Sequence, residues 1–201
     1  EEADSADTRA WIEAQNALTF GYLGKVPERG RIRDRLERIW NYERYGTPSR
    51  QGPWYIYSRN TGLQNQSPLY VREGLNGAQR LLIDPNTWAQ DGATALDGWL
   101  PSYDGSKLLY SVQDGGTDWK ILRVLDVNTG QPLADEVRWA KFTGLAWVGE
   151  EGFLYSRFPE PEEGADFQAL NYNQAVYFHR LGTPQSEDEL VYATPDDPEV
   201  G

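Results

Sequence analysis

Apolar residues near the start of the chain recur with the period of a helix. Between residues 5 and 23 they are spaced by three and four positions, and they are Trp11, Ala14, Leu18 and Tyr22. Because an α-helix turns once every 3.6 residues, this spacing places them on one face and predicts an amphipathic helix. The side-chain oxygen of Asp4 or Ser5 is a suitable N-cap, and Gly24 and Pro27 end the helix.

A second helix is predicted over residues 28–40, again with one apolar face. Its apolar residues are Ile32, Leu36, Ile39 and Trp40. The opposite face is rich in arginine, which leaves two interpretations: a site for an anionic ligand, or a solvated face of ion pairs. Asp34 and Glu37 stand among the arginines and favour the ion pairs. Two short helices cannot cover both apolar faces by themselves, so the sequence indicates further structure that packs against them.

From Gly46 onward the helical period gives way to short runs of aromatic and β-branched residues, which favour strands. These runs occur at residues 54–59, 69–72, 80–83, 95–100, 107–111, 120–124, 142–148, 152–157 and 175–180. A Tyr-Ser pair recurs at Tyr57, Tyr110 and Tyr155, with separations of 53 and 45 residues. A period of about 40 to 50 residues with about four strands per unit is typical of the blades of a β-propeller.

These elements predict a mainly β fold in two parts. Residues 1–45 form a short helical N-terminal segment with two helices, and residues 46–201 form about three four-stranded blades of a β-propeller. Closed propellers usually have about four to eight blades, so the array is expected to be incomplete. A β-sandwich with a similar number of strands is the alternative. Because a blade buries its faces only against neighbouring blades, we expect an open array to be marginally stable or to self-associate.

The third repeat carries an acidic, proline-rich insertion between its inner strands. It consists of Phe158, Pro159, Glu160, Pro161, Glu162, Glu163, Gly164, Ala165 and Asp166. This composition does not favour regular structure, and long loops on a repeat scaffold are often functional. The carboxylates leave a divalent cation site open as an interpretation. Nothing fixes their geometry, however, and a solvated loop is favoured.

The charge balance excludes several classes of partner. The formal net charge is −12, from 31 acidic and 19 basic residues. Binding to nucleic acid or to an anionic membrane surface needs an excess of Lys and Arg, so neither partner is expected. The chain has no cysteine, which excludes disulfides and thiol chemistry within it. It begins at Glu1 rather than at Met, so we expect the natural start to be missing. A cytoplasmic location is expected, with the periplasm as the alternative.

The residues offer no complete catalytic or metal site. The nucleophile of an α/β-hydrolase sits in a Gly-x-Ser-x-Gly turn, and none is present, since Gly105-Ser106-Lys107 lacks the second glycine. His179 is the only histidine and falls in a predicted strand, where a structural or surface role is favoured. With one histidine and no cysteine, we expect no metal site and no cofactor. The residues by themselves predict a binding or interaction module without catalytic residues.

Several short strings are more specific than the composition. They lie at residues 8–11, 13–16, 40–46, 60–66, 82–86, 117–119, 137–142, 177–183 and 185–188. Residues 40–46, for example, read Trp-Asn-Tyr-Glu-Arg-Tyr-Gly. Through these strings the chain closely resembles the N-terminal part of prolyl oligopeptidases, in order from about Thr8 to Pro198. It is more similar to these proline-specific enzymes than to oligopeptidase B or the dipeptidyl peptidases.

The resemblance implies an architecture and an activity for a longer parent protein. In this family a seven-bladed propeller covers an α/β-hydrolase domain that cleaves short peptides on the carboxyl side of proline through an acyl-enzyme. The chain would supply the helical segment and the first blades, and the catalytic triad would lie beyond Gly201. Its expected partners are proline-containing short peptides, together with the hydrolase domain and remaining blades of the same polypeptide. A stand-alone interaction module without enzymatic activity is the alternative.

The resemblance also implies roles for individual positions. Phe142 matches an aromatic residue that projects into an apolar subsite for the substrate; the alternative is a place in the core of a blade. Asp118 matches an acidic residue that pairs with an arginine of the hydrolase domain; the alternative is an aspartate that only forms a turn. The insertion, over residues 158–173, matches a mobile loop at the domain interface that controls access, which would restrict the enzyme to oligopeptides.

Overall fold

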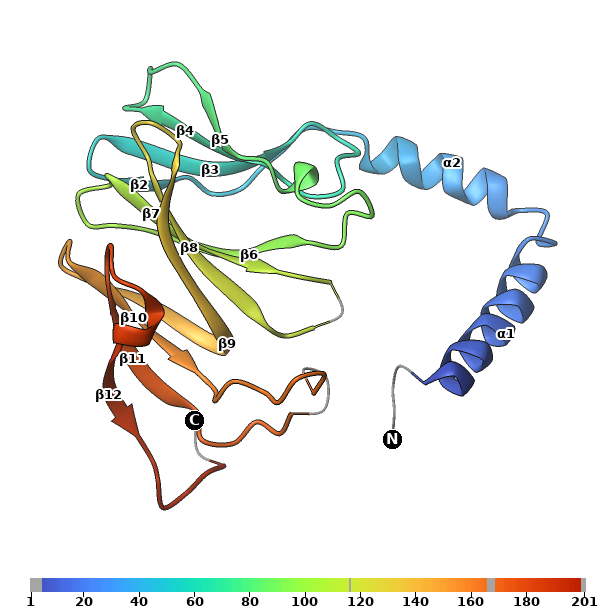
Figure 1. Cartoon of the computed structure of the whole chain (residues 1–201). Helices are drawn as coiled ribbons and strands as arrows, with labels where there is room; N and C mark the ends of the chain where they lie inside the picture. The colour runs from blue at the N-terminus through green and yellow to red at the C-terminus, as the bar shows by residue number, and fades with distance from the viewer. Residues whose placement is uncertain (1–4, 116, 166–168, 200–201) are drawn as a thin grey trace. The chain divides into compact units, whose positions relative to one another are not determined.

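The computed structural model describes residues 5–115, 117–165 and 169–199 of the chain. It divides into two compact units. The first contains both helices and residues 61–63, and the second contains the strands. Each unit is described by itself (Figure 1).

Both predicted helices are present. Helix α1 is Ala6–Leu23, and the Ser5 side chain caps it by accepting a hydrogen bond from the backbone N–H of Thr8. Helix α2 is Arg29–Trp40 and follows Glu28. Neither helix has a buried residue within this structure. Their large apolar side chains are therefore exposed: Trp11, Leu18, Phe20, Tyr22, Ile32, Leu36, Ile39 and Trp40.

The strands form two antiparallel sheets. The five-stranded sheet contains β1 (Arg44–Tyr45), β2 (Ser49–Gln51), β3 (Trp54–Asn60), β4 (Leu69–Glu73) and β5 (Arg80–Ile83). The seven-stranded sheet runs in chain order through β6 (Ala95–Pro101), β7 (Lys107–Gln113), β8 (Lys120–Asp126), β9 (Pro132–Val148), β10 (Gly152–Arg157), β11 (Ala175–Arg180) and β12 (Glu189–Ala193). Two 3-10 turns, η1 (Pro85–Thr87) and η2 (Gln185–Glu187), complete the elements. The expected mainly β fold with open, unclosed sheets is confirmed.

The predicted strand over residues 142–148 is not separate, because it is the second half of the 17-residue strand β9. The first half of β9 pairs with β8 and the second half pairs with β10, with a register shift between them. Trp139 and Phe142 have positive φ angles of 62° and 51°, which bend the strand at this point. Strand β9 thus ends one four-stranded blade and begins the next, so the seven-stranded sheet consists of two blades.

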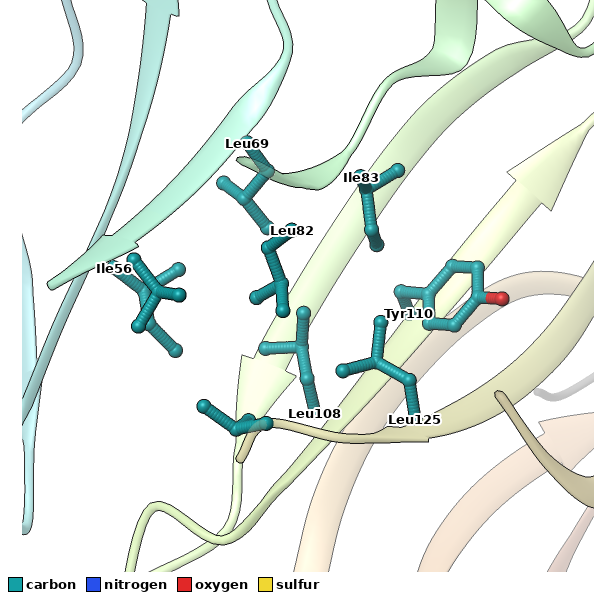
Figure 2. Packing of buried hydrophobic residues seen from close by; sticks show 9 residues of the cluster. Ile56, Leu69, Leu82, Ile83, Leu108, Tyr110 and Leu125 are labelled. Atoms are coloured by element: carbon teal, nitrogen blue, oxygen red, sulfur yellow. The ribbon is translucent and has the colours of Figure 1, made fainter. Parts of the chain in front are cut away.

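Alternation along the strands fills the spaces between blades. Successive side chains of a strand point to opposite faces, so Leu108 and Tyr110 face one way and Leu109 faces the other. The first face packs on the five-stranded sheet in a buried cluster that includes Ile56, Leu69, Leu82, Ile83, Leu108, Tyr110 and Leu125 (Figure 2). The second cluster joins the two blades of the larger sheet and contains Leu109, Leu122, Val124, Val137, Ala140, Trp147, Phe153 and Tyr155. Each blade is therefore stabilised mainly by its neighbours.

Candidate functional site

One border of the seven-stranded sheet gathers the segments that the sequence singles out. A continuous row of paired residues crosses all its strands near this border: Ala95, Gln113, Lys120, Ala140, Arg157, Ala175 and Ala193. The β7–β8 and β10–β11 connections both begin just past this row, on the same side of the sheet (Figure 1). The bend in β9 lies on the row itself. We call this border, with the connections that leave it, the loop edge.

Phe142 lies at the loop edge, in the bend of β9. Its side chain is 58% exposed within this structure, so it does not belong to the core of a blade. Its backbone has a φ of 51°, a left-handed conformation that residues with a β-carbon rarely adopt. The Nζ atom of Lys141 lies 5.4 Å from the centre of the Phe142 ring. Phe142 thus presents an exposed aromatic ring beside a cation.

Asp118 lies in the β7–β8 connection and is exposed. Within the part of the chain that the structure describes, its carboxylate forms no hydrogen bond or ion pair. The neighbouring Trp119 anchors the connection: its ring packs edge-on against Trp139 with the ring centres 5.6 Å apart. Asp118 is therefore held at the loop edge with its carboxylate available to a partner.

The acidic insertion is attached to the loop edge at both ends. Phe158 is only 5% exposed, donates its N–H to the carbonyl of Trp139 at 3.1 Å, and packs edge-on against Trp119. At the other end, Gln174 Nε2 donates to the carbonyl of Lys141 at 3.0 Å. Pro159, Glu160, Glu162, Glu163 and Gly164 are exposed, Pro161 and Ala165 are half-buried, and Asp166 lies outside the described residues. Phe158 is thus the anchor of this loop rather than part of its exposed portion.

Sequence reasoning missed the aromatic cluster that joins these segments, which we define as Trp119, Trp139 and Phe158. A groove of ≈ 650 Å³ lies beside it, lined in part by Trp88, Trp119 and Trp139. Trp119 and Trp139 both stand in strings that carry the family resemblance. Only the pairing of the strands, however, brings them together.

The single histidine lies in a buried network away from the loop edge. His179 on β11 is 0% exposed. Its Nδ1 lies 2.7 Å from Asp188 Oδ1 and its Nε2 lies 3.2 Å from Asp135 Oδ1. Asp188 also accepts a hydrogen bond from the Tyr155 hydroxyl at 2.5 Å. Because Asp135 belongs to the first half of β9 and the other groups to the following blade, the network connects two blades.

The protonation of this network follows from its geometry. Burial lowers the pKa of His179, but hydrogen bonds and charge attraction from Asp188 and Asp135 outweigh it and raise the pKa above its ordinary value. A neutral imidazole donates from only one nitrogen, so acceptors at both nitrogens favour the imidazolium. Burial, followed by the hydrogen bond to Asp188, raises the pKa of Tyr155, so its hydroxyl remains a donor. Both ring nitrogens of His179 are thus engaged with carboxylates.

The described residues offer neither a cluster of metal ligands nor a membrane-spanning helix. Within the described residues, no group of three or more His, Cys, Asp or Glu side chains is placed to hold a metal ion. No helix among them is both long and apolar enough to cross a membrane.

Comparison with known sequences gives a consistent family. The chain matches a family model described as "Prolyl oligopeptidase, N-terminal beta-propeller domain" over residues 1–201. The prolyl endopeptidase of Elizabethkingia meningoseptica is 37% identical over 191 residues, which are 95% of this chain and 27% of that protein. A prolyl oligopeptidase of Omphalotus olearius is 31% identical over 220 residues, covering 97% of this chain and 29% of that protein. The chain thus spans less than a third of the length of these relatives.

Comparison with solved structures agrees. A chain from a study of two prolyl endopeptidases and their inter-domain dynamics is 49% identical, with a TM-score of 0.73 over 98% of this chain and 28% of that one. Prolyl oligopeptidase B of Galerina marginata, bound to a 25mer macrocyclization substrate, is 28% identical, with a TM-score of 0.85 over 98% of this chain and 30% of that one. Both similarities extend over nearly the whole of this chain.

Proposed function

Because the chain belongs to the prolyl oligopeptidase family, we propose that it forms part of the propeller lid of a proline-specific serine peptidase. In this proposal the catalytic residues lie elsewhere in the same polypeptide, and the parent cleaves short peptides on the carboxyl side of proline through an acyl-enzyme. The chain itself binds and admits substrates but does not cleave them.

The state of His179 supports the absence of catalysis within the chain. A serine nucleophile needs an imidazole that accepts its proton. His179 is the only histidine in the sequence, it is buried, and its two ring nitrogens face Asp135 and Asp188. An imidazolium held in this way has no free nitrogen for a serine hydroxyl. In the proposal, the histidine that acts as general base for acyl transfer is supplied from outside this chain.

The observation that carries the proposed lid role is the gathering of three features at the loop edge. Phe142 offers an exposed apolar ring, Asp118 offers an unpaired carboxylate among the described residues, and the acidic loop starts from the buried Phe158. In the proposal, Phe142 contacts an apolar side chain of the peptide and Asp118 pairs with an arginine of the hydrolase domain. The loop controls entry, and a lid of this kind favours short peptides because bulky ones cannot pass it.

The experiment compares the 201-residue chain with the full-length protein encoded by its gene. Both are assayed with an acylated Gly-Pro-p-nitroanilide and with the matched Gly-Ala peptide as the control for proline. We expect the full-length protein to release nitroaniline from the proline peptide only, and the 201-residue chain to release none. Turnover by the chain alone would contradict the assignment of catalysis to another region. A full-length protein inactive on both peptides would contradict the peptidase assignment and favour an interaction module.

A further inference from the structure

Lys141 is a positive charge at the loop edge that has no acidic partner among the described residues. The other two lysines of the strand-containing unit are paired: Lys107 Nζ lies 3.7 Å from Glu150 Oε2, and Lys120 Nζ lies 2.8 Å from Asp97 Oδ2. In the part of the chain that the structure describes, no carboxylate oxygen lies within 4.0 Å of Lys141 Nζ. The chain has a net charge of −12, so a cation without an acidic neighbour among the described residues is unexpected.

Aromatic rings hold the Lys141 ammonium group in place. Its Nζ lies 4.8 Å from the centre of the Trp119 ring and 5.4 Å from that of Phe142. A ring attracts a cation through its quadrupole but has no net charge, so the rings orient the ammonium group without neutralising it. The backbone of Lys141 is fixed as well, because its carbonyl accepts a hydrogen bond from Gln174. The result is a half-buried, oriented charge beside an exposed phenyl ring.

We propose that Lys141 is a specificity-determining residue that recognises a carboxylate of the peptide substrate, next to the apolar side chain that contacts Phe142. This inference rests on the proposed function, in which Phe142 lines a substrate subsite. The carboxylate comes either from an Asp or Glu side chain of the peptide or from its C-terminus. Because the chain as a whole is acidic, it repels an anionic peptide at long range. Lys141 therefore discriminates between anionic and neutral peptides only at short range, where the peptide is docked.

The test uses the full-length enzyme and substrates matched in size. The first series is acetyl-Xaa-Leu-Gly-Pro-p-nitroanilide, in which Xaa is Glu, Gln or Lys. The second series consists of internally quenched peptides that continue two residues past proline and end in a free carboxylate or an amide. Wild type is compared with Lys141→Gln, which removes the charge, and with Lys141→Arg, which keeps it. The first series reports on a side-chain carboxylate and the second on the C-terminal one.

We expect Lys141→Gln to lower kcat/KM about threefold to fivefold for the anionic member of one series, because exposed ion pairs are of this strength. The neutral members should be unchanged, and Lys141→Arg should restore discrimination. An equal fall for the Glu, Gln and Lys peptides would indicate a structural role and overturn the inference. No change in either series would also overturn it. Each of these two outcomes counts only against the role of Lys141 if the wild-type enzyme still cleaves the Gln peptide, because the proposed function then stands. A wild-type enzyme that cleaves no proline peptide would instead refute the proposed function itself.

Salt provides an independent measurement if Lys141→Gln does not fold. Screening weakens an exposed ion pair as ionic strength rises. The wild-type preference for the anionic peptide over its neutral counterpart should therefore shrink between low salt and about 1 M salt, where the Debye length is about 3 Å. A preference that is absent at low salt, or that does not depend on salt, would overturn the inference.

Discussion

The protonation of His179 makes a prediction about stability and pH. Replacing His179 by Gln removes the cation between Asp135 and Asp188, and breaking a buried ion pair in this way costs about 3 to 5 kcal/mol. Because the folded-state pKa of His179 is raised, its contribution is fully present below its ordinary pKa of 6.5 and is lost as the pH rises through the folded value. The difference in Tm between wild type and His179→Gln should therefore be largest between about pH 5 and 6.5.

Arg180 provides the matched control for His179. It is the next residue on β11, and its ion pair with Glu151, at 3.0 Å, is exposed. Arg180→Gln should change stability by about 1 kcal/mol or less, because surface ion pairs contribute little. Thermal unfolding of the full-length protein at several pH values measures both variants. A His179→Gln effect as small as that of Arg180→Gln, or one that grows toward alkaline pH, would contradict the assignment of an imidazolium.

Replacing Phe142 should weaken substrate recognition without a comparable loss of stability. Its side chain is exposed, so Phe142→Ala should change stability by about 0.5 kcal/mol or less. If the ring contacts the substrate, the loss of its apolar surface should lower kcat/KM about tenfold for peptides with an apolar residue before Gly-Pro. Phe142→Leu keeps an apolar side chain and should lose less. Peptidase assays and thermal unfolding of the full-length enzyme make the comparison, and a large loss of stability with unchanged kcat/KM would refute the prediction.

Sequence reasoning at the scale of single residues is limited by the distance between partners along the chain. The sequence favours a structural or surface role for His179 but does not reveal its partners, since Asp135 lies 44 positions away and Asp188 lies nine positions away. Strand pairing brings them together, and no local pattern records it. Lys141 is similar: it stands in a recognisable string, but only the fold shows that no carboxylate of the described residues lies beside its ammonium group.

Most strands are predictable from the sequence, but the short strands β1 and β2, the strand β12 and the first half of β9 with its bend are not. Short apolar runs separated by glycine turns indicated most strands correctly, because glycine marks positions that need a positive φ. The bend instead uses Trp139 and Phe142 in left-handed conformations, at φ 62° and 51°. The sequence has no glycine there to signal the change of direction. The Ser156 N–H donates to Thr143 Oγ1 at 2.7 Å across the irregular pairing, and no local sequence pattern predicts this contact either.

The hairpin turn at Gly52 in the first blade lies close to the turn at Asp104 in the second blade, and this proximity leads to a prediction about two glycines. Gly52 has a φ of +55°, and a β-carbon there would lie 2.2 Å from the carbonyl oxygen of Asp104 in the neighbouring blade. Gly149 has the same φ, but its β-carbon would meet nothing within 4 Å. Both Gly→Ala changes carry the left-handed penalty of about 1 to 2 kcal/mol. Only Gly52→Ala also forces the blades apart, which should add about 1 to 3 kcal/mol.

Chemical denaturation of the full-length protein compares the two alanine variants. Because backbone strain is equal in both, the difference between them isolates the contact between blades. The Asp104 turn is held by its own hydrogen bonds: Asp104 Oδ1 accepts from the backbone N–H of Ser106 at 2.8 Å, and this bond is the main cause that lowers the pKa of the Asp104 carboxyl to about 2. A β-carbon at position 52 would therefore meet the backbone of a hydrogen-bonded turn rather than a flexible side chain. Equal destabilisation by Gly52→Ala and Gly149→Ala would mean that the turns do not hold these blades together.

For the molecule as a whole, the repeat period is the main sequence feature that predicts the blades of a propeller. The spacing of 53 and 45 residues between the Tyr-Ser pairs predicts blades without any knowledge of the strand pairing. The apolar faces of both helices were expected to need a cover, and they are exposed in this structure. What no repeat could indicate is the loop edge, because it depends on the register of all seven strands in one sheet. Register is fixed by many side-chain contacts at once rather than by a local signal.

The loop edge leads to a prediction about access. Joining Phe158 to Ala169 through two glycines removes the acidic segment, most of whose described residues are exposed, but keeps its buried anchor Phe158. If the loop controls entry, kcat/KM for a proline-containing peptide of about thirty residues should rise relative to that for a tetrapeptide, since a shorter lid obstructs bulky substrates less. A second variant, with Glu160, Glu162 and Glu163 changed to Gln, keeps the length and removes charge, so it separates obstruction from repulsion. Steady-state measurements of kcat/KM and stopped-flow measurements of peptide entry, both on the full-length enzyme, test this prediction. If neither variant alters entry of the long or the short peptide, the loop is a passive surface segment and control of access must lie in another part of the enzyme.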